Sequence, residues 1–348
     1  MDFYQGRRIL VTGGTGSIGS QIVRQLLACN PSTLRVLSRD ETKQLELQES
    51  LARPGLPPSL RFLIGDVRDP ARLRRAMEGI EIVFHAAAMK HVPACEYNPF
   101  EAVQTNVLGT QNVITSAREA GVGRVIVVST DKATRPENTM GATKLLAEKL
   151  VSAAHHFSPG QILCAVRFGN VLGSRGSLVP LVERQLHDRQ PVAITHPDMT
   201  RFMMTIEEAV RLLLLAGVRA RGGEVFILKM PALRVLDLIE ILIEEHAARE
   251  GGIAEDYPIR RIGMRPGERL HEVLLTEEER MRTREEETVF VLEPQGGSRT
   301  PEQLSRSLQR LPEYDSSQLA PLSKESIRRL LVRAGILAPA EKSAVDVS

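Results

Sequence analysis

The sequence predicts an α/β protein with a doubly wound parallel sheet and a smaller C-terminal α/β lobe. An apolar strand, residues 8–12, runs into a glycine-rich turn and an amphipathic segment over 17–28. Strand-like and helix-like segments then alternate through the first half of the chain, which is typical of a parallel sheet covered by helices. Residues 125–129 are almost wholly apolar and β-branched, as expected of a strand buried on both faces.

Each element follows from its local pattern. Proline and glycine residues at 54–58 separate the second helix from the third strand. After about residue 167 the strands become short and alternate with helices and basic loops. The predicted strands are 8–12, 34–38, 60–64, 82–86, 125–129, 162–167, 192–195 and 224–228. The predicted helices are 17–28, 41–51, 70–77, 99–120, 140–155, 206–216 and 235–250.

Composition excludes several classes of function. The 348 residues carry 45 Lys and Arg against 43 Asp and Glu, too even a balance for a broad nucleic-acid-binding surface. Tryptophan is absent and aromatic residues make up only 4%, so few side chains can stack on bases. No apolar run reaches bilayer length and no signal-peptide pattern is present, so we expect a cytoplasmic protein. His155 and His156 lack partners at metal-ligand spacing, and no metal site is expected.

The turn after the first strand has the glycine spacing of a dinucleotide-binding loop. Glycines here permit a tight turn and close approach of the backbone to a pyrophosphate, and the following helix directs its free N–H groups at that anion. The strand before the turn and the helix after it supply the structural context that this motif requires. The predicted contacts are Gly13, Thr15, Gly16, Ser17, Ile18 and Gly19.

The end of the second strand indicates which dinucleotide binds. Arg39 suits the 2′-phosphate of NADP, because its guanidinium fork matches phosphate oxygens. Asp40 keeps NAD as the alternative, since an acidic residue here accepts hydrogen bonds from ribose hydroxyls. We favour NADP. The ends of the second, third and fourth strands provide the other predicted contacts, namely Ser38, Lys43, Asp66, Val67, Ala86, Ala87 and Ala88.

The chain therefore divides into three predicted parts. Residues 1–168 form a dinucleotide-binding domain that includes the catalytic loop and helix. Residues 169–294 form mainly a substrate-binding lobe, with some elements returning to the sheet. Residues 295–348, rich in Gly, Ser, Pro and Arg, are expected to form a partly extended tail.

Several motifs resemble those of the extended short-chain dehydrogenase/reductases, which have a Rossmann-type fold. They are the glycine turn, Asp66, His85-Ala-Ala-Ala88, Asn106, Ser129-Thr-Asp-Lys132 and Lys144. Within that superfamily, residues 7–275 resemble the soluble, C5-inverting 4,6-dehydratases that act on UDP-N-acetylglucosamine in polysaccharide biosynthesis. The motifs specific to this branch are Met89-Lys-His-Val-Pro93, Ser129-Thr-Asp-Lys-Ala133, Met140-Gly-Ala-Thr-Lys144, Arg167 to Ser177 and Thr200 to Thr205. The resemblance also implies cofactor contacts from Lys90, Asn106 and Lys144.

One position departs from the superfamily pattern. Most members use Tyr-x-x-x-Lys, in which the tyrosine takes a hydroxyl proton and the lysine lowers the tyrosine pKa and holds the cofactor ribose. Met140 stands at the tyrosine position, and none of the four tyrosines has a lysine four residues later. Some dehydratases carry methionine there too, so we expect another group to be the base at C4. The candidates are Lys144, Asp131 and Thr130.

The resemblance assigns dehydration to Asp131 and Lys132, which follow the fifth strand at the edge where such sheets bind ligands. Oxidation at C4 acidifies the C5 proton, a base removes that proton while an acid helps the C6 hydroxyl leave, and hydride returns to C6. We expect Asp131 to be the acid and Lys132 the base. Burial beside Lys144 and the positive nicotinamide is expected to lower the pKa of Lys132. Reprotonation on the opposite face would invert C5.

Substrate contacts are expected mainly from the second half. A UDP-sugar carries a diphosphate, which arginine binds well. Glu268, in the turn that begins at Arg265, is expected on a ribose hydroxyl, and Lys90 and His91 are expected near the sugar or cofactor. The remaining predicted contacts are Asn170, Ser174, Arg175, Ser177, Thr195 and Arg201.

Three alternative functions stay open. A retaining 4,6-dehydratase differs only in the C5 stereochemistry of its product. A UDP-sugar 4-epimerase would oxidise C4 without eliminating water, and Asp131, Lys132 and the missing tyrosine argue against it. A non-catalytic NADP-binding regulator would bind cofactor without turnover. The resemblance further implies a homo-oligomer, either a dimer formed through helices 99–120 and 140–155 or a larger ring.

Overall fold

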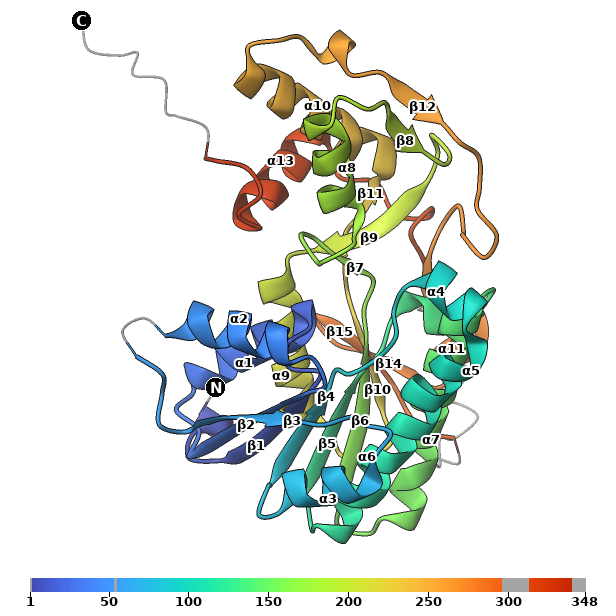
Figure 1. Cartoon of the computed structure of the whole chain (residues 1–348). Coiled ribbons are helices and arrows are strands. Elements are labelled where there is room, and N and C mark those ends of the chain that lie inside the picture. Colours follow the sequence, from blue (N-terminus) through green and yellow to red (C-terminus); the bar gives the residue numbers. More distant parts are fainter. Residues whose placement is uncertain (1, 53–54, 296–312, 340–348) are drawn as a thin grey trace, which may run out of the picture.

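A nine-stranded sheet forms the centre of the computed structural model, which describes residues 2–52, 55–295 and 313–339 (Figure 1). Seven neighbouring strands are parallel, which confirms the predicted fold class. In spatial order they are β3 (Leu60–Ile64), β2 (Thr33–Ser38), β1 (Arg8–Thr12), β4 (Ile82–His85), β5 (Arg124–Val128), β6 (Ile162–Arg167) and β10 (Val225–Leu228). Two antiparallel strands, β15 (Val289–Leu292) and β14 (Thr283–Glu285), extend the sheet beyond β10.

Helices cover both faces of this sheet (Figure 1). One layer contains α1 (Ser17–Leu27), α2 (Glu41–Leu51) and α9 (Ile206–Arg219). The other contains α3 (Pro70–Met77), α6 (Gly109–Glu119) and α7 (Thr139–Phe157). None of the helices in the described part of the chain combines the length and the apolar character that crossing a membrane requires.

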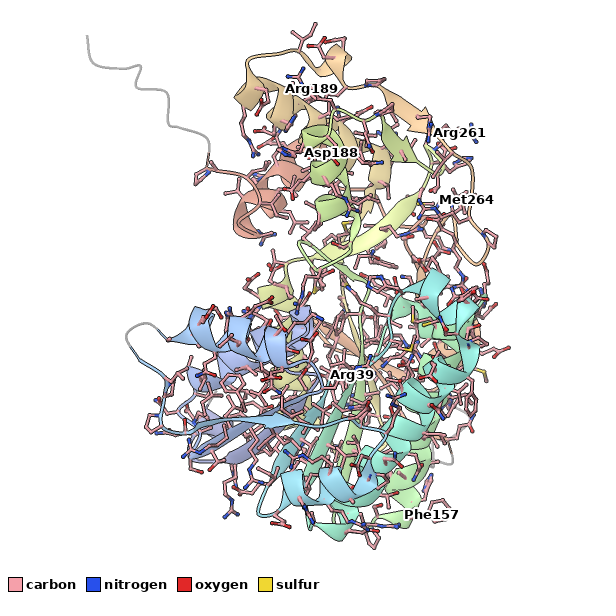
Figure 2. All side chains as sticks on the ribbon, viewed as in Figure 1. Arg39, Phe157, Asp188, Arg189, Arg261 and Met264 are labelled. Atoms are coloured by element: carbon pink, nitrogen blue, oxygen red, sulfur yellow. The ribbon has the colours of Figure 1, made fainter. Side chains whose placement is uncertain are left out.

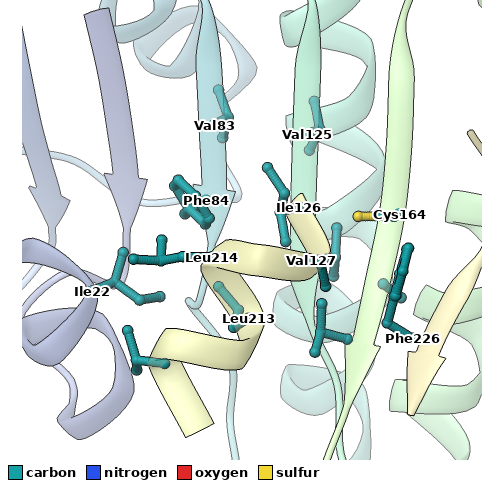
Figure 3. Packing of buried hydrophobic residues seen from close by; sticks show 14 of the residues in the cluster. Ile22, Val83, Phe84, Val125, Ile126, Val127, Cys164, Leu213, Leu214 and Phe226 are labelled. Carbon is teal, nitrogen blue, oxygen red and sulfur yellow. The ribbon is translucent and has the colours of Figure 1, made fainter. Parts of the chain in front are cut away.

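The main core lies between the sheet and these layers. Figure 3 shows Leu213 and Leu214 of α9 packed against β4 and β5, beside Ile22 of α1. Val125 and Ile126 are fully buried. Complete burial of each such side chain contributes about 1.5–3 kcal/mol, which explains why the central strands are uniformly apolar.

A second lobe lies beyond one edge of the sheet and has its own apolar core (Figure 1). Three short strands, β7 (Asn170–Val171), β9 (Thr200–Met204) and β11 (Ala232–Arg234), form its larger sheet. Its helices are α8 (Leu178–His187), α10 (Val235–Glu250) and α13 (Lys324–Arg333). Its strand pair is β8 (Val192–Ile194) with β12 (Ile259–Arg261). A further pair, β13 (Val273–Leu275) with β16 (Tyr314–Asp315), packs Leu274 and Leu275 into the main core.

The C-terminal segment differs from the extended tail that was predicted. Ile327, Leu330 and Leu331 of α13 are buried in the core of the second lobe. Arg328 of α13 pairs with Glu244 of α10. Three apolar residues at helical spacing form the buried face of this helix, although the composition around them is polar. Residues 296–312 and 340–348 of the predicted tail lie outside the described residues.

The helix predicted over 99–120 has three consecutive parts. A short α5 (Pro99–Ala102) leads into a π-helical turn, η2 (Val103–Leu108), and then into α6. Such π-turns are rare and frequently occur at functional sites. Here the turn contains Asn106, which is buried. The other short elements are η1 (Asp2–Tyr4), α4 (Val92–Tyr97), η3 (Asp131–Ala133), η4 (Ala254–Asp256) and α11 (Glu277–Arg280).

Candidate active site

The glycine turn packs against the end of β4. Gly13 has a positive φ of 66°, and a Cβ on it would lie 2.5 Å from the backbone nitrogen of Ala87. Thr15 and Ser38 are joined by a hydrogen bond of 2.8 Å between their hydroxyls, which ties the turn to β2. Gly16 is the N-cap of α1 and offers no side-chain acceptor to the helix. The bare backbone and uncapped helix N-terminus fit a dinucleotide pyrophosphate.

Arg175, predicted to bind substrate, instead lies on this turn. Its guanidinium donates to the backbone carbonyl of Thr15, and its backbone N–H donates to Ser17 Oγ at 3.0 Å. Lys90 Nζ in turn donates to the Arg175 carbonyl at 2.6 Å. The loop between β7 and α8 therefore reaches from the second lobe to the predicted cofactor site. His91 is close to the same loop, because a Cβ on Gly176 would lie 2.6 Å from its ring.

Arg39 and Asp40, the charged residues after β2, differ in how far their side chains are already paired. Asp40 caps α2, accepting a hydrogen bond from the Lys43 backbone at 3.0 Å, and also pairs with Lys43 Nζ. The Arg39 side chain is 62% exposed, and its Nη1 lies 3.7 Å from Asp66 Oδ2. Figure 2 shows Arg39 on the side of the sheet that is nearer the second lobe. Arg39 is therefore available to a ligand, whereas the Asp40 carboxylate is already engaged.

Asp66 and Asn106 make internal contacts. The Asp66 carboxylate accepts two hydrogen bonds from the Arg68 side chain, at 3.0 and 2.8 Å, beside a cleft of about 550 Å³. Asn106 accepts from the Met89 backbone N–H at 2.8 Å and donates to the Met89 carbonyl and to Thr143 Oγ1. Both amide hydrogens of Asn106 are thus taken. The π-turn directs this side chain toward the loop before Lys90, so it supports the cofactor site indirectly. Val67 lies buried next to Asp66.

The predicted acid and base are together in η3, directly after β5. Asp131 is fully buried, and its Oδ1 accepts from Thr130 Oγ1 at 2.8 Å and from Lys132 Nζ at 2.9 Å. A second carboxylate, Glu272, lies 3.4 Å from Lys132 Nζ and is only 2% exposed. Sequence reasoning missed Glu272. The one signal was a glutamate immediately before the apolar strand β13, where a charge is out of place unless it is paired.

The expectation that the Lys132 pKa would be lowered is wrong for this arrangement. Burial alone lowers the pKa of Lys132, but the nearby carboxylates of Asp131 and Glu272 outweigh it, and the pKa is raised. Burial raises the pKa of Glu272, although the positive charge of Lys132 acts to lower it. The sequence indicated Lys144 as the neighbour of Lys132, whereas the fold places two acids there.

Lys144 occupies a different environment. It is buried on α7, and its Nζ donates to the Val128 carbonyl, at the end of β5, over 2.6 Å. Burial lowers the pKa of Lys144 to about 8, despite the opposing effect of Glu148 one turn further along the helix. Glu148 itself accepts hydrogen bonds from Arg167 Nε at 3.0 Å and from Ser129 Oγ at 2.6 Å.

Met140 fills the predicted tyrosine position with an apolar contact. It is buried and packs in a small cluster with Cys95 and Ala102. The tyrosines have other surroundings: Tyr4 donates to Leu214, Tyr314 donates to Met230, Tyr257 packs on His246, and Tyr97 is 88% exposed.

Two of the predicted substrate contacts are half-buried residues whose side-chain oxygens are buried. Among the described residues, Asn170 Oδ1 and Ser177 Oγ are buried polar atoms without a hydrogen-bond partner in the protein. Such groups are rare and call for a partner. Ser174, in the same loop, is also buried. Arg265 and Glu268 form the expected turn, in which each backbone N–H donates to the other residue.

Thr195 and Arg201 were predicted to contact the substrate, but their side-chain polar groups contact other residues of the protein. Thr195 Oγ1 donates to Met199 Sδ. The Arg201 guanidinium donates to the carbonyls of Thr200, Leu270 and Arg269, and its Nε lies 3.6 Å from Glu272. Arg201 therefore holds the loop that carries Glu272, together with the Thr200 backbone N–H, which also donates to the Leu270 carbonyl.

A family model described as "Polysaccharide biosynthesis protein" matches residues 9–294. A Methanocaldococcus jannaschii protein named as an uncharacterized membrane protein is 51% identical over 95% of this chain and 96% of its own length. A UDP-N-acetylglucosamine 4,6-dehydratase (inverting) of Campylobacter jejuni is 40% identical over 84% of each chain. A UDP-glucose 4-epimerase of Rickettsia akari is 41% identical over 78% of this chain and 79% of its own.

Solved structures share the fold. Pen from Bacillus thuringiensis superimposes with a TM-score of 0.87 at 41% identity, covering 95% of this chain and 98% of that one. The dTDP-glucose 4,6-dehydratase DesIV from Streptomyces venezuelae, solved with NAD bound, has a TM-score of 0.65 at 28% identity. That similarity covers 76% of this chain and 86% of DesIV.

The buried Lys144 makes stability depend on pH. In the folded protein its pKa is about 8, against about 10.4 in an unfolded chain. Between these values the unfolded chain holds the extra proton, so stability rises with pH, and below them the fold carries the cost of the buried charge. We expect Lys144→Met to raise the free energy of unfolding at pH 7 by at most about 3 kcal/mol, at about 1.4 kcal/mol per pKa unit.

Urea unfolding of the cofactor-free proteins at pH 7 and pH 10 measures this effect, and the gain should shrink at pH 10. Lys149→Met, on the exposed face of the same helix, is the control. A Lys144→Met protein that gains more stability at pH 10 than at pH 7 would contradict the expectation.

Proposed function

The chain belongs to the polysaccharide biosynthesis protein family, and from that premise we propose that it is an inverting UDP-N-acetylglucosamine 4,6-dehydratase. The observation that carries the proposal is the contact of 2.9 Å between Lys132 Nζ and buried Asp131 at the end of β5. It unites an acid and a base where ligands of such sheets bind. The Campylobacter jejuni relative, which bears this name, supports it.

We propose NADP as the cofactor, held by the glycine turn and by Arg39. When bound, the nicotinamide supplies the hydride acceptor for C4 and the hydride donor for C6. The exposed Arg39 favours a 2′-phosphate, and the engaged Asp40 carboxylate disfavours a bare ribose. DesIV, which binds NAD, supports a nicotinamide dinucleotide in general.

Proton movements within the pair Lys132 and Asp131 balance. Transfer of one proton from Nζ to Oδ1 breaks an N–H bond and forms an O–H bond, giving a neutral amine and a neutral carboxyl. The amine then takes the C5 proton, and the carboxyl protonates the C6 hydroxyl, which leaves as water. The pair returns to ammonium and carboxylate. The raised pKa of Lys132 thus describes the resting pair, from which the reactive form is one proton transfer away.

We propose Lys144 as the base at C4. Its pKa of about 8 leaves an appreciable neutral fraction near pH 7, and Met140 cannot take a proton. Asp131 would be occupied with C6. Thr130 donates its hydroxyl hydrogen to Asp131, which leaves it poorly placed to act as a base.

A UDP-sugar 4-epimerase is the second candidate. The Rickettsia relative with that name favours it. Epimerisation needs only C4 oxidation and return of hydride on the other face, so it would leave Asp131 and Lys132 without a role.

The reaction can be followed by NMR with UDP-N-acetylglucosamine in heavy water. A dehydratase forms a 4-keto-6-deoxy product with deuterium at C5, and the product's C5 stereochemistry separates inversion from retention. An epimerase forms the C4 epimer without deuterium at C5, and a non-catalytic regulator forms neither.

In the same assay, Lys132→Ala should lower turnover at least about 100-fold, because general acid–base groups contribute about 10²–10⁴-fold. Lys149→Ala is the matched control. Undiminished turnover with normal deuterium uptake at C5 would exclude Lys132 as the base.

Arg39→Ala tests the cofactor choice. A charge-assisted hydrogen bond contributes about 1.5–3 kcal/mol, so the Kd for NADP should rise at least about tenfold while the Kd for NAD stays constant. Calorimetric titration with each dinucleotide measures both constants. Arg249→Ala, an exposed arginine at the end of α10, is the control. Equal weakening of NAD and NADP would argue against a 2′-phosphate contact.

We propose a dimer formed through α5, η2 and α7. Phe100, Leu108 and Leu146 on these elements are 65%, 49% and 50% exposed, an arrangement that favours a partner. Leu146→Asp should convert the dimer to a monomer in light scattering, because a charge would be buried in the interface. Leu45→Asp, on α2 and 56% exposed, is the matched control. A Leu146→Asp protein with unchanged mass would contradict this interface.

A further inference from the structure

The ammonium of Lys132 is flanked by two carboxylates that lie far apart in the sequence. Asp131 Oδ1 lies 2.9 Å away and Glu272 Oε1 lies 3.4 Å away. Both acids are buried, whereas the Lys132 side chain is 25% exposed. Lys132 is thus the member of this cluster that a molecule outside the protein can reach.

Each carboxylate has one oxygen without a partner in the protein. Within the described residues, Asp131 Oδ2 and Glu272 Oε2 are buried and accept no hydrogen bond. A buried carboxylate oxygen in this state is costly, so a purely structural ion pair would be expected to satisfy it. The cluster is therefore better suited to exchanging protons than to stabilising the fold.

The backbone of Glu272 is held rigidly. Its N–H donates to Ser316 Oγ at 2.9 Å, and its carbonyl accepts from the Ser316 backbone N–H at 2.9 Å. Arg201 supports the same loop through the carbonyls of Leu270 and Arg269. The side chain thus reaches Lys132 from a fixed position directly before β13.

We propose that Glu272 is a positioning residue for the reaction: its carboxylate holds Lys132 Nζ and orients the amine once the proton has passed to Asp131. This proposal rests on the proposed dehydratase function. A neutral amine that donates a remaining hydrogen to Glu272 Oε1 must direct its lone pair elsewhere. The remaining side is the exposed one, where the C5 proton of a sugar would lie.

The charges around Lys132 give the proposal a measurable sign. The charged groups that act on Lys132 are Asp131, Glu272 and Arg201, and Arg269 acts on Glu272. Glu272 favours the charged form of Lys132, and the positive charge of Arg201 disfavours it. Without the charge of Glu272, the effect of Arg201 is less compensated, so the neutral amine of Lys132 becomes easier to form. A nearby charge shifts a pKa by about 1–3 units.

The first measurement needs no substrate. Acetylation of Lys132 as a function of pH, quantified by peptide mass spectrometry on the full-length protein, gives the midpoint at which its amine becomes reactive. Glu272→Gln should lower this midpoint by about one pH unit or more. Glu272→Asp, whose shorter side chain withdraws the charge, should lower it by less. Glu224→Gln is the control, since Glu224 is equally buried but binds the backbone of Arg221 and Gly222.

The second measurement is the pH profile of kcat with UDP-N-acetylglucosamine. The basic limb should move to lower pH in Glu272→Gln, in step with the acetylation midpoint, because loss of a proton from the pair Lys132 and Asp131 removes the acid for C6. In Glu272→Asp the plateau should fall about 10- to 100-fold, because a small displacement of a catalytic group has effects of this size. KM should change little in both variants.

The outcomes separate the two proposals. An acetylation midpoint and a basic limb that are both unchanged in Glu272→Gln would overturn the role of Glu272. Failure of both Glu272 variants to fold, with Glu224→Gln folded, would show a structural role and overturn it as well. A shifted midpoint in a protein whose wild type forms no 4-keto-6-deoxy product would instead refute the dehydratase function and support the contact between Glu272 and Lys132.

Discussion

The contact between Lys132 and two buried carboxylates is the interaction on which the rest of the site depends. Asp131 comes from the loop after β5, and Glu272 comes from the segment directly before β13. A partly buried ammonium needs compensating charge, since removing it from water is costly. This need joins distant parts of the chain: Arg201 and Ser316 hold Glu272, and the end of β5 holds Asp131.

The sheet supplies the other fixed points. Parallel strands end at one edge, so the glycine turn after β1, Arg39 after β2 and η3 after β5 share that edge. Helix α7 brings Lys144 to the Val128 carbonyl there. Burial then gives the two lysines different properties: the pKa of Lys144 is lowered to about 8, whereas two acids raise that of Lys132. One fold thus provides a candidate base for C4 and a separate proton-transfer pair for C5 and C6.

Local sequence patterns were sufficient to predict the features whose residues are neighbours both in sequence and in space. These features are the glycine turn, the apolar strands and the pair Asp131-Lys132. The contacts that local patterns did not indicate are long-range ones. The Arg201 guanidinium donates to the carbonyls of Arg269 and Leu270. The loop before α8 brings Arg175 to the glycine turn after β1. Apolar residues of α13 are buried, within a segment whose composition indicated a partly extended tail.

The sequence by itself determined the parallel sheet, the glycine turn, the absence of a tyrosine at position 140 and the position of Asp131 and Lys132 directly after β5. These follow from short-range periodicity and residue chemistry. Only the tertiary structure decided what surrounds each charged group, and with it the direction in which the pKa of Lys132 moves. Electrostatic environment depends on distance in space, so a glutamate far along the chain could reverse an expectation based on the residues beside Lys132 in the sequence.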